Sequence, residues 1–133
     1  MPRPNKTAGL RHVALFVEDL GACVDFYVRL LGMEVEWQPD DDNFYLSSGN
    51  DNLALHRRHN SIEATAQRLD HIGFILDTKE EVDAWHDFFV AEGVEIKAAP
   101  RTHRDGARSF YCFDPDGTVV QMIYHPPISR GHA

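Results

Sequence analysis

The sequence predicts an α+β fold built from two copies of a strand–helix–strand–strand–strand unit. Residues 10–17, LRHVALFV, and residues 69–76, LDHIGFIL, share a histidine at the third position and the alternation of a half-buried strand. An amphipathic helical pattern follows each strand, and a glycine suited to cap a helix C-terminus, Gly32 or Gly93, ends each pattern. Because these features recur in the same order, the chain contains an internal repeat of one structural unit.

Capping signals mark where both helices begin. Asp19 is a suitable N-cap for the first helix, and Thr78 with Glu81 matches a capping box at the start of the second. Each helix carries apolar residues at helical intervals, so one side of it packs against a sheet. These residues are Leu20, Cys23, Val24, Tyr27, Leu30 and Leu31 in the first helix, and Val82, Trp85, Phe88 and Phe89 in the second.

Further strands complete each unit after its helix. The two glycines open similar phrases, GMEV at 32–35 and GVEI at 93–96. A pair of strands then follows in each half, and each pair is joined by turn residues, GN at 49–50 and DPDG at 114–117. The predicted pairs are about 43–47 with 52–56, and about 109–113 with 118–124.

The repeat is predicted to form one domain, because 133 residues lie within the usual size of a single domain. The segment 57–68 is polar and is predicted to link the two units. The predicted boundaries are 9–125 for the domain, about 9–58 for its first module, about 68–125 for its second, and 1–8 and 126–133 for two loose tails.

Composition and charge exclude several classes of protein for this chain. The net charge of −8 and the pI near 5.3 disfavour a nucleic-acid partner. No apolar run approaches the ~20 residues of a membrane-spanning helix, and the N-terminus lacks the apolar stretch of a signal peptide. Cys23 and Cys112 are too few for a disulfide framework. We therefore expect a cytoplasmic protein with free thiols and no membrane partner.

Strand alternation places polar and small side chains on the sheet face that the helices do not cover. His12, Ala14 and Phe16 share this face in the first half, and His71 and Gly73 share it in the second. A histidine on a strand is more often a hydrogen-bonded sheet residue than a metal ligand. Two histidines at matching points of a repeat make metal ligation an equal alternative, and both interpretations stay open. Other strand residues grouped by parity are Ala54 with His56, Ser109 with Tyr111 and Phe113, and Gln121 with Ile123.

The repeat and its motifs resemble the vicinal oxygen chelate superfamily, which includes glyoxalase I, bleomycin-resistance proteins, fosfomycin-resistance enzymes and extradiol dioxygenases. The resemblance covers about residues 9–125. It rests on LRHVALFVEDLGACVDFYVRLLGMEV, LDHIGFIL and SFYCFDPDGTVVQMI. It implies two paired βαβββ modules that form an open, cup-shaped sheet, with a divalent metal in the cup of many members.

The resemblance places the metal ligands at His12, His71 and Gln121. Members with metal usually carry glutamate where this chain has Gln121, and the fourth ligand of glyoxalase I falls on Ala54. The implied cofactor is a divalent metal, Fe(II), Mn(II) or Zn(II). An amide oxygen is a weaker ligand than a carboxylate, so we expect weak binding and a partly empty site.

Further positions resemble active-site residues of the extradiol dioxygenases. Tyr111 lies ten residues before Gln121, at the spacing of their active-site tyrosine, and His59 resembles their acid–base histidine. His103 resembles a further histidine that precedes the SFY strand. The implied substrate pocket is lined by Ala14, Phe16, Ala54, His56, Gly73, His103 and Phe113.

Two functions follow from the resemblance. The first is a glyoxalase- or dioxygenase-like enzyme whose divalent metal chelates a small oxygenated, anionic substrate, while His59 and Tyr111 transfer protons. The alternative is a metal-free protein that sequesters a small molecule, as bleomycin-resistance proteins do. Basic residues near the expected mouth would guide an anion. These are Arg57, Arg58, Lys97, Arg101, Arg104 and Arg108.

The resemblance also implies a homodimer. It favours pairing of modules across two chains, which would place His12 of one chain beside the partner's His71 and the partner's Gln121. In either pairing, we expect the His12 and His71 side chains to converge on one cavity.

Overall fold

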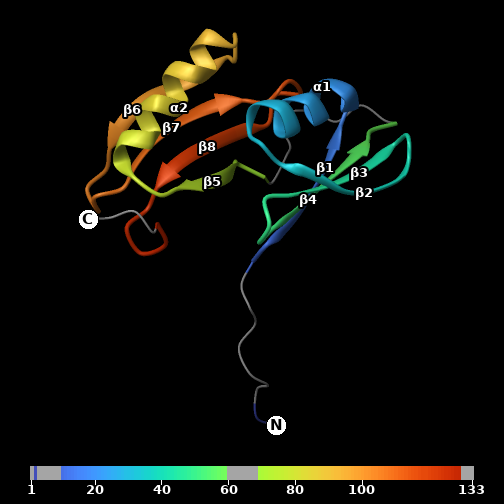
Figure 1. Cartoon of the computed structure of the whole chain (residues 1–133), viewed down its shortest axis with the longest axis horizontal. Helices are drawn as coiled ribbons and strands as arrows, with labels where there is room; N and C mark the ends of the chain where they lie inside the picture. Colours follow the sequence, from blue (N-terminus) through green and yellow to red (C-terminus); the bar gives the residue numbers. More distant parts are fainter. Residues whose placement is uncertain (1, 3–9, 60–68, 130–133) are drawn as a thin grey trace. The chain divides into compact units, whose positions relative to one another are not determined.

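The chain folds into two compact units, each with one four-stranded mixed sheet and a helical segment (Figure 1). The structure is a computed structural model that describes residues 2, 10–59 and 69–129. Unit 1 is Met1–His59 and unit 2 is Asn60–Ala133. The predicted α+β class and the repeated strand–helix–strand–strand–strand unit are confirmed. No helix in the described ranges is long and apolar enough to cross a lipid bilayer.

Unit 1 begins with a strand that pairs in parallel with the last strand of the same unit. The strand order in its sheet is β1-β4-β3-β2, and only the β1–β4 pairing is parallel. The elements are β1 His12–Val17, α1 Leu20–Asp25, η1 Phe26–Leu30, β2 Glu34–Asp40, β3 Asn43–Ser47 and β4 Asn52–Arg57.

Unit 2 repeats this topology with a longer helix. Its strand order is β5-β8-β7-β6, again with the first and last strands in parallel. Helix α2 contacts all the strands of this sheet and lies along one of its faces (Figure 1). The elements are β5 Ile72–Leu76, α2 Lys79–Ala91, β6 Ile96–Thr102, β7 Arg108–Phe113 and β8 Val119–Tyr124.

Each sheet has a buried face toward its helix and a second face, here called the open face. In β1, Leu15 and Val17 are buried, whereas His12 and Ala14 are exposed and Phe16 is 65% exposed. In β8 the buried residues alternate with half-buried residues that include Gln121. The alternation predicted from the sequence is therefore seen in β1 and β8, whereas three consecutive residues of β4, Leu53 to Leu55, are all buried. The fully buried side chains include Val17, Leu20, Cys23, Tyr27, Leu46 and Leu55 in unit 1, and Val82, Phe89, Phe110, Cys112, Val120 and Met122 in unit 2.

The predicted helix ends are confirmed. The Asp19 carboxylate accepts a hydrogen bond from the backbone N–H of Ala22 at 3.0 Å, and the Thr78 hydroxyl accepts one from that of Glu81 at 3.2 Å. Gly32 and Gly93 have φ of 80° and 79°, a left-handed conformation that glycine adopts without strain.

The second half of the first helix differs from the expected α-helix. The apolar spacing through Leu31 predicts one continuous α-helix, but Phe26–Leu30 forms a π-helical turn. The backbone N–H of Leu31 donates to the carbonyl of Phe26, five residues earlier, at 3.2 Å. Phe26, Tyr27 and Leu30 in this wider turn are all buried, so the departure from the ideal helical repeat lies in a packed segment.

Two other expectations need correction. His71 was expected within a strand over 69–76, but β5 starts at Ile72, so His71 immediately precedes it. The tail predicted at 126–133 is anchored as far as Ser129, which is 3% exposed. The Ser129 hydroxyl donates to the backbone carbonyl of Leu76 at 2.6 Å and accepts from the N–H of His125 at 2.9 Å. Most of the 1–8 tail, the end of the second tail and residues 60–68 of the predicted linker lie outside the described residues.

Candidate functional site

A directional chain of hydrogen bonds fixes His12 on the open face of unit 1. His12 and Asn52 are register partners on β1 and β4, and His12 Nδ1 lies 2.7 Å from Asn52 Oδ1. The Asn52 amide nitrogen points to the Glu36 carboxylate at 3.5 Å. Because Asn52 Oδ1 can only accept, Nδ1 of His12 carries the proton. His12 Nε2 is then left as a free acceptor or ligand atom, with no hydrogen bond to any other described residue.

Aromatic side chains extend the open face of unit 1 beyond His12. Asn43 Oδ1 lies 2.6 Å from Nδ1 of His56, and the His56 ring is 5.8 Å from the rings of both Phe16 and Tyr45. Tyr45 in turn stacks on Trp37 at a ring-centroid distance of 4.9 Å. This surface could hold a planar or apolar ligand.

His71 is held in unit 2 by a carboxylate. Its Nδ1 donates to Asp70 Oδ2 at 2.7 Å, and this hydrogen bond lowers the pKa of the Asp70 carboxyl. The His71 ring packs edge-on against Tyr111 at 5.5 Å. As with His12, the Nδ1 contact leaves Nε2 as the free ring nitrogen, because a carboxylate only accepts from an imidazole. A carboxylate on the second nitrogen is the usual support of a metal-ligating histidine.

Gln121 belongs to a second hydrogen-bonded chain on the same open face. Its Nε2 donates to Ser109 Oγ at 3.1 Å, and Ser109 Oγ lies 2.8 Å from Nε2 of His103. Gly73 is the register partner of Gln121 on β5, and a Cβ built on Gly73 would lie 3.8 Å from Gln121 Oε1. The glycine leaves the side of this carbonyl oxygen uncovered. Ser109 is 1% exposed, so the chain is anchored in a buried hydroxyl.

The three expected metal ligands are all neutral donors. His12, His71 and Gln121 each have one side-chain atom fixed by a neighbour and one atom left free. Two neutral imidazoles and an amide supply no charge, which lowers the affinity compared with a set that includes a carboxylate. Within the described parts of the chain, no group of three or more His, Cys, Asp or Glu side chains could hold a metal. His12 lies in unit 1 and His71 and Gln121 in unit 2, so their convergence stays a prediction.

The remaining residues expected at the site differ in their exposure to solvent. His59 is exposed near the end of unit 1, and Phe113 and His103 are half-buried in unit 2. Ala54 is fully buried, with Ala14 and Tyr45 as its register partners. Its place in a substrate pocket stays a prediction.

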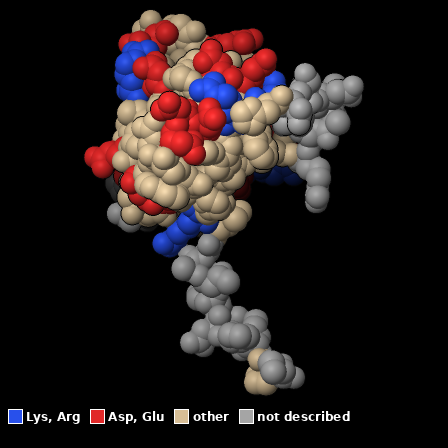
Figure 2. Space-filling model, turned by 90° about the vertical axis from the view of Figure 1, so that its right-hand side faces the viewer, with Lys and Arg blue, Asp and Glu red and all other residues tan. Residues whose placement is uncertain are grey.

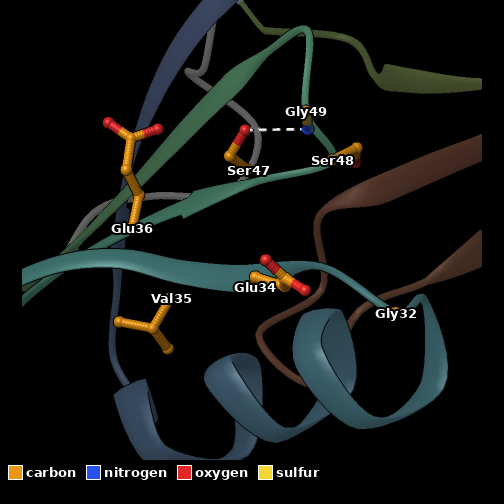
Figure 3. Close-up of a pocket in the computed structure, with 7 residues that line it drawn as sticks. All are labelled: Gly32, Glu34, Val35, Glu36, Ser47, Ser48 and Gly49. Carbon is orange, nitrogen blue, oxygen red and sulfur yellow. Dashed lines mark hydrogen bonds between the residues drawn. The ribbon is translucent and has the colours of Figure 1, made fainter.

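A hollow of about 390 Å³ lies elsewhere in unit 1, beside the start of β2. In Figure 3, Val35 points to the helix side of β2 and Glu36 to the opposite side, while Ser47 Oγ accepts from the N–H of Gly49 at 2.9 Å. None of the residues expected at the site lines this hollow. Its lining is Gly32, Glu34, Val35, Glu36, Ser47, Ser48 and Gly49.

Three of the basic residues expected to guide an anion are already paired. Arg57 contacts Asp42 at 2.8 Å, Arg58 contacts Glu18 at 2.9 Å, and Arg108 forms a two-point contact with Asp83. Lys97, Arg101 and Arg104 are exposed. On the face shown in Figure 2, blue and red side chains are interspersed among the described residues, without a broad basic patch.

The sequence did not reveal the residues that orient the expected ligands. Asn52, Asp70 and Ser109 hold His12, His71 and Gln121, respectively. Asp70 stands next to His71 in the sequence, and this adjacency was an available signal. Asn52 could be found only from the register of β1 against β4, which is set by residues 40 positions apart.

Comparison with known proteins defines the class of this chain. Its topology of two βαβββ units is that of the glyoxalase-like fold. Residues 9–122 match the model of the Glyoxalase/Bleomycin resistance protein/Dioxygenase superfamily. The chain belongs to this superfamily.

Its relatives include proteins with different activities. A trivalent organoarsenical cleaving enzyme from Bacillus sp. is 29% identical over 131 residues, which cover 87% of this chain and 79% of the relative. The fosfomycin resistance protein FosX from Listeria monocytogenes is 30% identical over 119 residues, with 86% and 88% coverage. The crystal structure of lactoylglutathione lyase from Agrobacterium tumefaciens superposes with a TM-score of 0.77 at 23% identity, with 93% and 98% coverage.

Proposed function

We propose that this chain is a glyoxalase- or dioxygenase-like enzyme that acts on a small oxygenated substrate with a divalent metal held by His12, His71 and Gln121. One observation carries the proposal. Both histidines have Nδ1 engaged by an oxygen acceptor at 2.7 Å, Asn52 Oδ1 for His12 and Asp70 Oδ2 for His71. This arrangement presents Nε2, and such second-nitrogen contacts are the usual support of metal-ligating histidines.

The metal would supply Lewis-acid chemistry to a substrate with two adjacent oxygens. The side chains around it have separate tasks in this proposal. Tyr111, edge-on to His71, would present a phenol that donates a hydrogen bond to a substrate oxygen. His59, exposed near the end of unit 1, would exchange protons with the substrate. Lys97, Arg101 and Arg104 would attract an anionic substrate.

A metal-free binding protein is the second candidate. Gln121 brings no charge to the donor set, and the open face of unit 1 exposes large aromatic surface. Phe16 is 65% exposed and Trp37 is 57% exposed, while Trp37 and Tyr45 stack beside His56. Such a surface suits sequestration of a planar molecule without chemistry.

We also propose that the chain acts as a homodimer in the cytoplasm. Strands β1 and β5 are edge strands of their sheets, and Phe16 and Ile75 on them are 65% and 44% exposed. Apolar edges of this kind favour pairing with another chain. Both cysteines are buried free thiols, as expected in a reducing compartment. Light scattering at micromolar concentration should give the mass of two chains, and a monomer would contradict the dimer.

Substitution at Gln121 separates the two candidate functions. Gln121→Glu supplies the missing carboxylate, so we expect Mn(II) or Fe(II) affinity to rise at least ~10-fold, equivalent to about 1.4 kcal/mol. His12→Ala should abolish binding in both backgrounds. The measurement is the melting temperature during Mn(II) titration, on protein purified without chelators or metal-affinity resin.

The metal-free candidate predicts a different result for Gln121→Glu. In that case the new carboxyl would lie unpaired in a part-apolar site, its pKa would rise, and stability would fall without a metal response. Absence of Mn(II)-induced stabilisation in both the original chain and Gln121→Glu would overturn the enzyme proposal.

A further inference from the structure

The proposed function uses Gln121 as a ligand but leaves unexplained the hydrogen bonds that link Gln121 to Ser109 and Ser109 to His103. Three side chains from two strands and the loop between β6 and β7 meet at one buried oxygen, Ser109 Oγ. Its distances are 2.8 Å to His103 Nε2 and 3.1 Å to Gln121 Nε2. No other described side chain or backbone group bonds to this hydroxyl, and Ser109 is 1% exposed.

The direction of these hydrogen bonds follows from the orientation of the Gln121 amide, whose Nε2 lies 3.1 Å from Ser109 Oγ. The Gln121 amide nitrogen only donates, so Ser109 Oγ accepts from it. The hydroxyl hydrogen of Ser109 then needs an acceptor, and His103 Nε2 is its only other partner among the described residues. If His103 carried a proton on Nε2, two donors would point at Ser109 and its own hydrogen would be buried without a partner, which is costly. His103 is therefore protonated on Nδ1.

Arg101 is the one contact that opposes this assignment. Its Nη2 lies 3.5 Å from His103 Nδ1, and a guanidinium can only donate. Arg101 is exposed, so water can accept its hydrogens at little cost. The bond between Ser109 and His103 is shorter, and Ser109 has no access to water. The buried bond therefore decides the tautomer.

We infer that Ser109 and His103 are positioning residues that hold Gln121 with its carbonyl oxygen, rather than its amide nitrogen, toward the open face of unit 2. The inference deepens the proposed function, on which its metal-binding consequence rests. A carbonyl oxygen there accepts a cation or a hydrogen-bond donor of a ligand and repels an anionic oxygen. Gly73 beside it leaves that oxygen accessible.

The inference makes a specific statement about Gln121→Glu. A carboxylate has no hydrogen to donate, so Ser109 must give its hydroxyl hydrogen to the new Glu side chain. His103 must then donate from Nε2 to Ser109. Replacing the amide by a carboxylate therefore moves the proton of His103 from Nδ1 to Nε2, although the two residues share no hydrogen bond.

Long-range ¹H–¹⁵N correlation spectra of the metal-free, ¹⁵N-labelled chain in alkaline buffer test this directly. We expect a bare Nε2 on His103 in the original chain and a protonated Nε2 in Gln121→Glu. His56 and His86, which lie outside this chain of hydrogen bonds, serve as internal controls and should keep their tautomers. A protonated Nε2 on His103 in the original chain, or the same tautomer in both proteins, would overturn the inference.

A metal-binding measurement then tests the consequence for Gln121. Ser109→Ala releases the amide, so we expect Mn(II) affinity to fall about 10-fold, as for other residues that orient a ligand. Ser109→Thr retains the hydroxyl and should restore the affinity, which a loss of packing alone would not do. Equal affinity of Ser109→Ala and the original chain would overturn the positioning role.

The two experiments separate this inference from the proposed function. If no form of the chain binds Mn(II) but His103 shows the expected change of tautomer, the metal-dependent function fails and the orientation of Gln121 stands. If Mn(II) binds and His103 shows the opposite tautomer, the orientation is overturned and the metal site stands. The tautomer comparison needs no Ser109 variant, so it remains decisive even if Ser109→Ala fails to fold.

Discussion

Asn52 Oδ1 lies 2.7 Å from Nδ1 of His12, its register partner on the neighbouring parallel strand. The contact joins residues that are far apart in sequence, and it fixes which ring nitrogen of His12 faces outward. The same unit contains a second pair of this kind, Asn43 with His56, at 2.6 Å. The two pairs differ in that only His12 belongs to the proposed ligand set, which makes them a matched test.

Asn52→Ala should weaken Mn(II) binding by about 10-fold, because the His12 ring loses the contact that fixes its orientation and tautomer. Asn43→Ala removes the corresponding contact of His56 and should leave Mn(II) affinity unchanged. Isothermal titration of both variants checks the prediction. Equal losses of Mn(II) affinity in the two variants would mean that Asn52 affects binding only through the stability of the fold.

Gly73→Ala should leave the fold intact and reduce ligand access to Gln121. The added Cβ would meet its three nearest atoms at 3.7–3.9 Å, an ordinary contact distance. Loss of backbone freedom in the unfolded chain should stabilise the protein by about 0.4–1 kcal/mol. Gly49→Ala is the contrasting variant, since φ is 109° there and a side chain is strained. Thermal unfolding of both variants should therefore show shifts of opposite sign, and a lower melting temperature for Gly73→Ala would contradict the prediction.

The ion pair between Asp83 and Arg108 should make stability depend on acid pH. Arg108 donates to both Asp83 oxygens, at 2.7 and 3.0 Å, and these hydrogen bonds hold the pKa of Asp83 below its ordinary value of 3.8. Because the pKa of Asp83 is lower in the folded than in the unfolded protein, the ion pair stabilises the fold at pH values above the unfolded-state pKa. This stabilisation is lost as the pH falls through the folded-state pKa.

Asp83→Asn should therefore cost up to about 1 kcal/mol at neutral pH, as a well-formed surface pair does, and nothing in strong acid. Urea unfolding at several pH values measures the difference. Glu95→Gln, at an exposed position without a side-chain bond to described residues, is the control. The assignment would be contradicted if the free energies of unfolding of Asp83→Asn and the original protein differed by the same amount at neutral pH and in strong acid.

Cys112 should be unreactive toward thiol reagents in the folded protein. Burial, with a smaller contribution from Asp114, raises the pKa of its thiol to about 12, so almost no thiolate forms in mildly alkaline buffer. In Cys23→Ala, Cys112 is the sole thiol, and we expect it to react with Ellman's reagent only after denaturation. Rapid reaction of the folded variant would show that β7 opens readily.

The architecture could be predicted from the sequence because the patterns that define its strands and helices are local. Alternation in LRHVALFV separated the buried Leu15 and Val17 from His12. Thr78 could be identified as a cap because its partner Glu81 lies three residues away. The hydrogen bonds of the candidate site are different, since Asn52 reaches His12 only through strand pairing and Ser109 meets His103 across a loop.

Two other features depended on packing that no local pattern contains. The apolar spacing of the first helix is the same for an α-helix and for a helix that widens at Phe26–Leu30, so the π-helical turn could not be predicted. Ser129 looks like an ordinary tail residue, and only its bond to the Leu76 carbonyl shows that the segment is tied to β5.

The π-helical turn has a consequence for changes in chain length. A π-helical bond closes over five residues where an α-helical bond closes over four, so Phe26–Leu30 contains about one residue more than an α-helix of the same span requires. A one-residue deletion there could be absorbed by a return to α-helical bonding, leaving Gly32 and β2 in place. The same deletion in β1 or β4 would shift the pairing by one residue and turn every following side chain to the other face. The first helix is therefore where unit 1 can best tolerate a one-residue deletion.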